Sequence, residues 1–280
     1  MSEIGYLRRK WLNRIMSALS SAAAGLAILV LALILGYTLA HGIAFLNLDF
    51  LTRAAGPVGE AGGGMRNEIF GTLILITLAS ILALPIGLMA GISMAEFASP
   101  KMAYAVRFVA DILAGVPSIV VGVFAYAIVV RPMHSYSALS AGVALAIIMV
   151  PVVARTAEES LRLVPNSMRE AALALGITRS RAVIGVIMPG AMTGIITGIM
   201  LAIARIAGET APLIFTALGS QFGFQGLTKP IGALPLQIFR YASSPYPDWQ
   251  QQAWAGAFLL ILLVLGISIL VRRLSNRRQS

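Results

Sequence analysis

The sequence predicts an all-α protein with six membrane-spanning helices. Three observations support this fold class. Hydrophobic residues make up 58% of the 280 residues and charged residues only 11%, whereas about a quarter of the residues in a soluble domain are charged. The mean hydropathy is +0.87. Long apolar runs alternate with short segments that carry most of the charges, which is the pattern of a polytopic membrane protein.

The first helix is expected near residues 22–40, inside an uncharged run from Ile15 to Leu48. This run is longer than the core of a signal peptide, which has about 7–15 residues, so we expect an uncleaved helix. Basic residues between Arg8 and Arg14 precede it and are interpreted as a cytoplasmic anchor. The glycine-rich stretch from Gly56 to Gly64 lacks the lysine of a phosphate-binding loop and is predicted to be an external loop.

Five further apolar runs predict the remaining spans, at residues 69–95, 112–130, 138–154, 190–218 and 252–271. The chain therefore divides into four segments. They are a cytoplasmic N-terminal segment (1–21), the first membrane helix with its external loop (22–66), a core of five helices (67–271) and a cytoplasmic basic tail (272–280).

The distribution of basic residues orients the chain. Six spans place both termini on the same side of the membrane. With the N-terminus inside, about 15 lysines and arginines lie inside and about five outside, which favours N-in and C-in under the positive-inside rule. The net charge of +10 is explained by these orientation determinants, so we expect membrane lipid and no nucleic acid as a partner.

A polar segment at residues 155–188 separates two apolar spans and is predicted to be cytoplasmic. Ser167 and Glu170 have the spacing of a helix capping box, and Gly176 stands where a helix commonly ends in a left-handed residue. The short helix between them presents one apolar face, formed by Met168, Ala171, Ala172 and Leu175. Such a helix either docks into a groove on another protein or simply connects two spans. The tandem pair Glu158 and Glu159 is expected to lie in the solvated part of this segment.

Two charged residues inside the fifth predicted span are candidates for an anion pathway. Arg205 and Glu209 are four residues apart, so they lie on one helix face and can form an ion pair. A charge at the centre of a membrane helix costs about 2.5–3.5 kcal/mol or more and is usually functional. Arginine keeps its charge and presents a planar fork that suits oxyanions. The alternative is a pair that only orients the helices. Arg155 is a second candidate anion contact, or else an orientation anchor.

No arrangement typical of an enzyme is found in the sequence. The chain contains no cysteine, and His41 and His134 are far apart, so no metal site is expected. No match to the nucleotide-binding pattern G-x-x-x-x-G-K-[ST] occurs, so any nucleotide hydrolysis must reside on a different chain. The tract 229–241 is expected on the external side, either as an interfacial helix or as a docking surface for an extracytoplasmic partner.

Two sets of residues carry a resemblance to a known family. Glu170, Ala171, Ala172, Gly176 and Pro189 have the spacing of the motif E-A-A-x3-G-x9-I-x-L-P, and Val186 and Met188 replace its usual isoleucine and leucine. In this respect the chain resembles the permeases of ABC importers. Residues 115–118, 151–169, 204–212 and 234–238 further resemble the PstA-type permeases of phosphate-specific importers.

The resemblance implies a type I ABC-importer permease fold with a cytoplasmic coupling helix near 167–176, in the inner or plasma membrane of a prokaryote. It implies a heterodimer with a PstC-like permease, two PstB-like ATPase subunits that use ATP and Mg²⁺, and a PstS-like phosphate-binding protein. This chain itself would bind no cofactor. In the family the coupling helix contacts the ATPase, and residues matching Arg205, Glu209 and Arg155 are associated with phosphate passage. The coupling residues are Ser167, Glu170, Ala171, Ala172, Gly176 and Pro189.

The residues leave other functions open. The chain is alternatively a permease for another oxyanion, such as phosphonate, molybdate or sulfate, because permeases inherit much of their selectivity from the binding protein. An ion-coupled secondary transporter would need ionisable or unwound sites in both halves, whereas only Arg205 and Glu209 qualify here. A membrane scaffold that transports nothing has little reason to keep a buried Arg–Glu pair.

Overall fold

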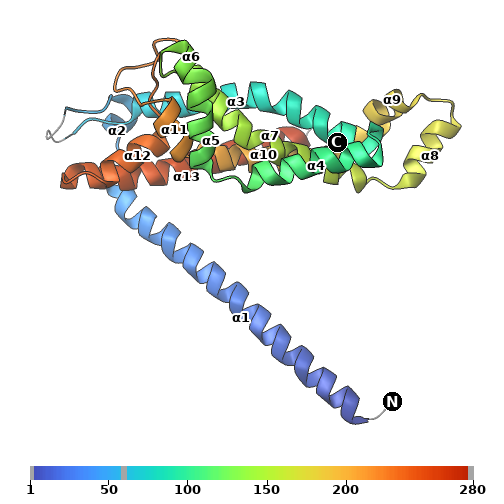
Figure 1. Cartoon of the computed structure of the whole chain (residues 1–280). Coiled ribbons are helices and arrows are strands. Elements are labelled where there is room, and N and C mark those ends of the chain that lie inside the picture. Colours follow the sequence, from blue (N-terminus) through green and yellow to red (C-terminus); the bar gives the residue numbers. More distant parts are fainter. Residues whose placement is uncertain (1–2, 58–61, 277–280) are drawn as a thin grey trace.

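The computed structural model describes residues 3–57 and 62–276, and within these ranges the chain is helical and contains no strand. Four long helices form an elongated bundle: α3 (Arg66–Ile92), α7 (Ala138–Arg162), α10 (Met188–Ala207) and α13 (Pro247–Asn276). Helix α1 (Glu3–Gly42) leaves one end of the bundle at a wide angle (Figure 1). Part of the predicted glycine-rich loop (58–61) and the last residues of the predicted basic tail (277–280) lie outside the described residues.

The described helices confirm an all-α membrane protein. Five of them are long and apolar enough to span a membrane, and a bent pair forms a sixth candidate. This pair consists of α4 (Pro100–Gly115) and the helical segment Ser118–Met133, which contains α5 (Ser118–Ala125), and the two meet at 101°. The single span predicted at residues 112–130 is therefore wrong. Val116 is extended because it precedes Pro117, and Pro117 supplies no backbone N–H to continue the helix.

The fifth predicted span (190–218) is also interrupted. Helix α10 ends at Ala207, and a short helix, α11 (Ala211–Thr216), follows after a break of three residues. Pro212 stands in the first turn of α11, where its missing N–H costs nothing. The break places Glu209 outside any helix, one turn beyond Arg205.

The core of the bundle is α7, which packs against α3 on one side and α10 on the other. Glycines on the outer helices permit the close approach, as is common between membrane helices. A Cβ atom added at Gly91 of α3 would lie 2.7 Å from the carbonyl oxygen of Ala154, and one added at Gly198 of α10 would lie 2.2 Å from Oγ1 of Thr156. The buried residues of the largest apolar cluster come mainly from α3 and α7. These three helices therefore form one tightly packed layer.

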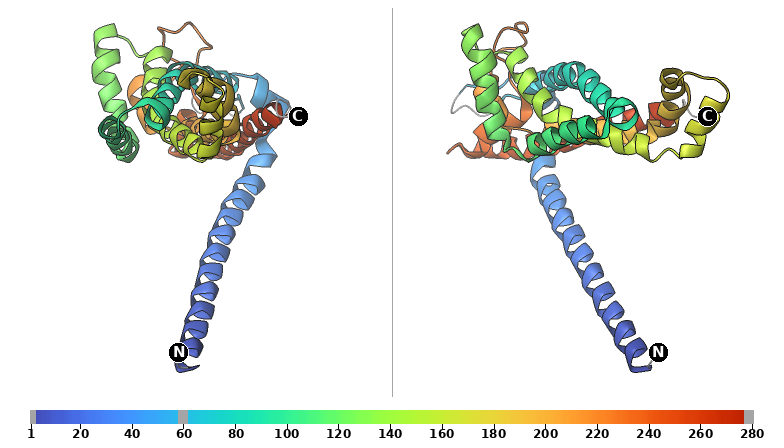
Figure 2. Two further views of the ribbon diagram at one scale, coloured as in Figure 1. Left: turned by 90° about the vertical axis from the view of Figure 1, so that its right-hand side faces the viewer. Right: turned by 45° about the vertical axis from the view of Figure 1, so that its right-hand side comes forward.

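The two ends of the bundle carry different short elements. One end carries α8 (Asn166–Ala174) and α9 (Arg179–Ala182), and Figure 2 (left) views the bundle from this α8 end. The opposite end carries α2 (Leu48–Thr52), α6 (Arg131–Met133), α11 and α12 (Leu234–Ala242). Helix α12 forms part of the tract predicted to be an interfacial helix.

Helical turns of other kinds adjoin several of the α-helices. A 3₁₀ turn, η1 (Ile43–Phe45), follows α1. Three π-helical turns are formed: η2 (Ser93–Phe97) after α3, η3 (Tyr126–Val130) after α5 and η4 (Val183–Ile187) before α10. Each widens one turn of a continuous helix by one residue, because the helical backbone runs on through Arg66–Phe97, Ser118–Met133 and Arg179–Ala207.

Candidate functional site

Helix α8 begins differently from the sequence-based prediction. The residue before its first turn is Pro165, and no side chain caps the helix. The predicted capping box of Ser167 and Glu170 is therefore wrong, because the helix starts at Asn166 and Ser167 already lies within its first turn. Proline fixes its own φ at −57° here, so it sets the start of the helix without a hydroxyl cap.

The end of α8 confirms the predicted left-handed exit. Gly176 has φ +74°. Its N–H donates to the carbonyl of Leu173 at 2.9 Å, and the N–H of Ile177 donates to the carbonyl of Ala172 at 3.3 Å. These two bonds form a Schellman motif, which satisfies carbonyl groups that the last helical turn leaves free.

Only part of the apolar face predicted for α8 is buried against the described residues, and the rest is exposed. Ala172 is buried against the rest of the chain. Met168 is 40% exposed and Leu175 is 80% exposed. Leu173 and the preceding Leu163 are exposed as well. The α8 end therefore presents an apolar surface that no described residue of this chain covers.

One arginine fastens α8 to the bundle. Arg169 donates from Nε and Nη2 to Oε1 of Glu96, at 3.1 and 2.8 Å. Its Nη2 also donates to the carbonyl of Leu161 at 2.7 Å, and its Nη1 donates to the carbonyl of Val164 and to Oδ1 of Asn166. Glu96 is 4% exposed and belongs to η2. Arg169 is one of the basic residues that the positive-inside rule counts on the inner side, and local spacing does not predict its partner. A single glutamate at the end of an apolar span was the available signal that a partner was required.

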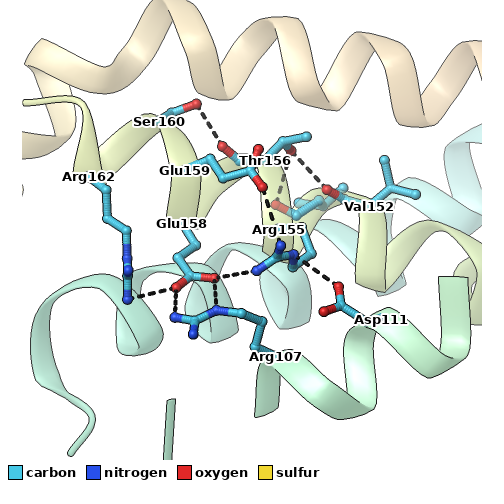
Figure 3. A network of polar contacts seen from close by, with 10 residues as sticks. Arg107, Asp111, Val152, Arg155, Thr156, Glu158, Glu159, Ser160 and Arg162 are labelled. Atoms are coloured by element: carbon cyan, nitrogen blue, oxygen red, sulfur yellow. Dashed lines mark hydrogen bonds and ion pairs between the residues drawn. The ribbon is translucent and has the colours of Figure 1, made fainter. Parts of the chain in front are cut away.

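A second ionic cluster surrounds Glu158 (Figure 3). Its carboxylate is 1% exposed, accepts from Arg107 of α4 and Arg155 of α7, and forms an ion pair with Arg162 of α7. Nη2 of Arg162 lies 3.0 Å from Oε1, and Nη1 of Arg155 lies 3.2 Å from Oε2. The prediction that Glu158 lies in a solvated loop is wrong, because α7 continues to Arg162 and turns Glu158 toward α4.

Arg155, a predicted anion contact, is already surrounded by carboxylates. Besides Glu158, its guanidinium lies 3.2 Å from Oδ1 of Asp111 and 3.5 Å from Oε1 of Glu159. The side chains of Asp111 and Glu159 are 56% and 62% exposed. Arg155 is thus held between one buried carboxylate and two exposed ones.

The structure brings Arg205 and Glu209 together as the spacing predicts. Nε of Arg205 lies 3.8 Å from Oε1 of Glu209, and the two side chains are 42% and 18% exposed. Arg205 stands in the last turn of α10, where a positive charge interacts favourably with the helix dipole. Glu209 belongs to the break that follows rather than to the same helix.

Arg155 and Arg205 lie at different depths in the bundle. Helices α7 and α10 are antiparallel, because Thr156 faces Gly198 and Ser160 faces Gly194. Arg205 follows Gly198 by seven residues, so it lies about 10 Å further along the axis than Thr156, the neighbour of Arg155. The structure therefore separates the predicted site residues into four places. These are the α8 segment, Pro189 in the first turn of α10, the Glu158 cluster and the Arg205–Glu209 pair.

The chain is similar to known proteins along nearly its whole length. Residues 83–280 match the family described as "Binding-protein-dependent transport system inner membrane component". A protein of Yersinia pestis named "Phosphate transport system permease protein PstA" is 46% identical, over 94% of this chain and 90% of that relative. A protein of the same name from Pasteurella multocida is 42% identical, over 97% of each chain.

A solved structure shares the fold. The inward-facing MetNI methionine ABC transporter contains a chain with a TM-score of 0.62 and 21% identity, and the match covers 76% of this chain and 96% of that one. At this level of identity the similarity shows the fold alone. It confirms the prediction of an ABC-importer permease fold for the bundle.

Proposed function

Because this chain belongs to the family of binding-protein-dependent transport system inner membrane components, we propose that it is the permease subunit of an ATP-driven phosphate importer. The observation that carries the proposal is 46% identity over 94% of the chain to a protein named for phosphate transport. The arginine of the Arg205–Glu209 pair, at the end of a membrane helix, adds a group suited to an oxyanion.

The assembly that we propose contains this chain and a PstC-like permease in the membrane, two PstB-like ATPase subunits on the cytoplasmic side and a PstS-like phosphate-binding protein on the other side. ATP hydrolysis belongs to the ATPase subunits, and this chain is not catalytic. In the proposed orientation both termini and the α8 end are cytoplasmic, which agrees with the excess of arginines near that end.

The exposed apolar surface of α8 is the proposed contact with an ATPase subunit. Ala172 holds α8 to the bundle, whereas Met168 and Leu175 point away and are free to enter a groove. Glu170 and Ala171 are exposed on the same helix, and Gly176 gives the segment its turn toward α9. ATP-driven closure of the two ATPases would draw the coupling helices together and open the pathway outward.

The phosphate path that we propose includes Arg205, Glu209 and Arg155. Glu209 pairs with the Arg205 guanidinium when no phosphate is bound. Its negative charge also repels a bound anion and so favours release of that anion. At Arg155 an arriving anion exchanges with Asp111 or Glu159, whose exposed carboxylates are the weaker partners. Glu158 stays in place because it is buried and shared by three arginines.

Reconstitution of the four kinds of subunit in proteoliposomes tests the proposal. With ATP inside and binding protein outside, radiolabelled phosphate uptake is expected, and molybdate, sulfate or a phosphonate should not replace it. Uptake of one of these anions in place of phosphate would support the alternative oxyanion function. Uptake that persists without the ATPase subunits would identify a secondary transporter and refute the proposal.

Two variants test the assigned roles. Arg205→Ala should abolish uptake while the complex still assembles, and unimpaired uptake would remove Arg205 from the pathway. The combined change Glu170→Ala and Gly176→Ala should separate ATP hydrolysis from uptake. Normal stimulation of the ATPase by loaded binding protein in that variant would contradict the coupling role of α8.

A further inference from the structure

The π-helical turn η2 at the end of α3 is contacted by two arginines of the α8–α9 segment. Arg169 of α8 is hydrogen-bonded to Glu96, as described above. Arg179 of α9 lies over the ring of the adjacent Phe97, with its guanidinium carbon 5.7 Å from the ring centroid, which is within the range of a cation–π interaction. Arg169 of α8 and Arg179 of α9 thus contact two neighbouring residues of the same turn, η2.

The contact with Glu96 is the stronger of the two. Glu96 is 4% exposed and Arg169 is 19% exposed, so the pair is largely removed from solvent. A buried carboxylate that loses its partner is strongly unfavourable. Arg169 also donates to the carbonyls of Leu161 and Val164, in the last turn of α7 and just after it, and to Oδ1 of Asn166 within α8. Arg169 therefore ties α8 to α3 and to the end of α7 at once.

Helix α3 is well placed to pass on a displacement of η2. Along its length it is in close contact with α7, at Gly87 and Gly91. At the opposite end of the bundle, Oγ1 of Thr72 accepts from the backbone N–H of Leu234 at 2.8 Å. There Oγ1 of Thr210, the residue after Glu209, also donates to the carbonyl of Pro235 in the first turn of α12 at 3.4 Å.

We propose that Arg169 and Arg179 clamp η2 and that this clamp carries the motion of α8 into α3. Arg169, Arg179, Glu96 and Phe97 form the clamp. Glu96 is then a positioning residue, since it acts on transport through the placement of a helix. The inference rests on the proposed function only in that an ATPase supplies the displacement of α8.

A distance measurement tests the clamp independently of the transported substrate. The chain contains no cysteine, so cysteines introduced at the exposed Ser167 of α8 and Lys101, close to η2, can be spin-labelled uniquely. In the complete complex in nanodiscs, the Ser167–Lys101 distance should stay the same without nucleotide and with Mg-ATP bound to a hydrolysis-deficient ATPase. A second pair, from Ser167 to the matching loop of the sister permease, should change between these states. If both distances change, α8 moves independently of η2 and the clamp is refuted.

Substitutions supply the second arm of the test. Arg169→Gln and Glu96→Gln should each lower uptake by about fivefold or more, which is the scale of a typical coupling between sites. The double variant should be no worse than the poorer single variant. Arg181→Gln is the matched control, because this exposed arginine of α9 has no ion pair among the described residues, and its uptake should be unchanged.

The outcomes separate the two proposals. Losses that add up in the double variant, or normal uptake by Arg169→Gln, would overturn the clamp. If Arg169→Gln fails to assemble, two results still test the clamp. One is the uptake by the double variant, which leaves no buried charge unpaired. The other is the pair of distances measured in the otherwise unchanged chain. Absence of phosphate uptake by the wild-type complex would refute the proposed function, while the distance measurement would still test the clamp.

Discussion

Arg107 of α4 and Glu158 of α7 form a two-point ion pair across the bundle. Nε of Arg107 donates to Oε2 at 3.3 Å, and Nη2 donates to Oε1. Arg155 donates to the same carboxylate and Arg162 forms an ion pair with it, so one buried group binds three guanidinium groups and joins α4 to α7. Helix α4 and the following helix are bent relative to each other, and α4 is the arm of this bend nearer to α8 (Figure 1). The cluster therefore holds α4 against α7.

Glu158→Gln should lower the free energy of unfolding by about 3 kcal/mol, because it removes the shared partner of three arginines. Unfolding of the purified complex in mixed micelles measures the change. Glu159→Gln is the control. Its side chain is 62% exposed and, among the described residues, pairs only with Arg155, so its effect should stay below about 1 kcal/mol. Equal losses in the two variants would contradict the assignment of Glu158 as the centre of the cluster.

Arg169→Gln should destabilise the protein more than the double change Arg169→Gln and Glu96→Gln. The single change leaves the carboxylate of Glu96 buried and unpaired, at a cost of about 3–5 kcal/mol, whereas the double change leaves two neutral amides. Thermal inactivation of the complex in detergent ranks the variants. A double variant that is less stable than the single variant would show that Glu96 has another partner.

Gly91→Ala should destabilise the packing of α3 on α7 by about 1–3 kcal/mol, because its methyl group would meet backbone and side-chain atoms at 2.7 Å. Gly185→Ala is the control, since a Cβ atom there meets nothing within 4 Å. The yield of folded complex after heating distinguishes the two. Tolerance of alanine at Gly91 would mean that the two helices are less closely packed than described.

Gly176→Ala should impair coupling of ATP hydrolysis to uptake more than Gly176→Asn. The φ of +74° costs alanine about 1–2 kcal/mol, whereas asparagine adopts this conformation more readily. A Cβ atom at Gly176 meets nothing within 4 Å, so the backbone conformation alone causes the difference. The ratio of ATP hydrolysed to phosphate taken up measures the effect. Equal ratios in the two variants would indicate that the side chain itself obstructs a contact.

The sequence predicted the apolar helices well, because each has a long uncharged run. It did not predict where they break. Pro85 and Pro151 lie inside α3 and α7, while Pro117 ends a helix and starts another in a new direction. A proline in a membrane helix is tolerated when neighbours satisfy the freed carbonyl groups. Whether a proline is accommodated within a helix or ends it therefore depends on tertiary packing, which a local sequence pattern does not predict.

The local features of the candidate site were predicted from the sequence, whereas its contacts between distant segments were not. The Arg205–Glu209 pair and the turn at Gly176 follow from local spacing, and both are present. The partners that join other elements to Glu158 and Glu96 could not be predicted, because Arg107 and Arg169 lie 51 and 73 residues away from them in the sequence. Ion pairs between distant segments depend on the fold, and the sequence reports only that buried carboxylates need partners.

Among the described contacts, helix α1 meets the bundle near its C-terminal end, where Trp254 of α13 lies beside the Tyr37 ring, which stacks on His41 of α1 at a centroid distance of 4.0 Å. Its 40 residues span about 60 Å, roughly twice the thickness of the hydrocarbon layer. A helix of this length has to tilt or project from the bilayer. The join at Gly42 and η1 sets that tilt, so a thicker or thinner bilayer would change the angle between α1 and the bundle before it changed the bundle itself.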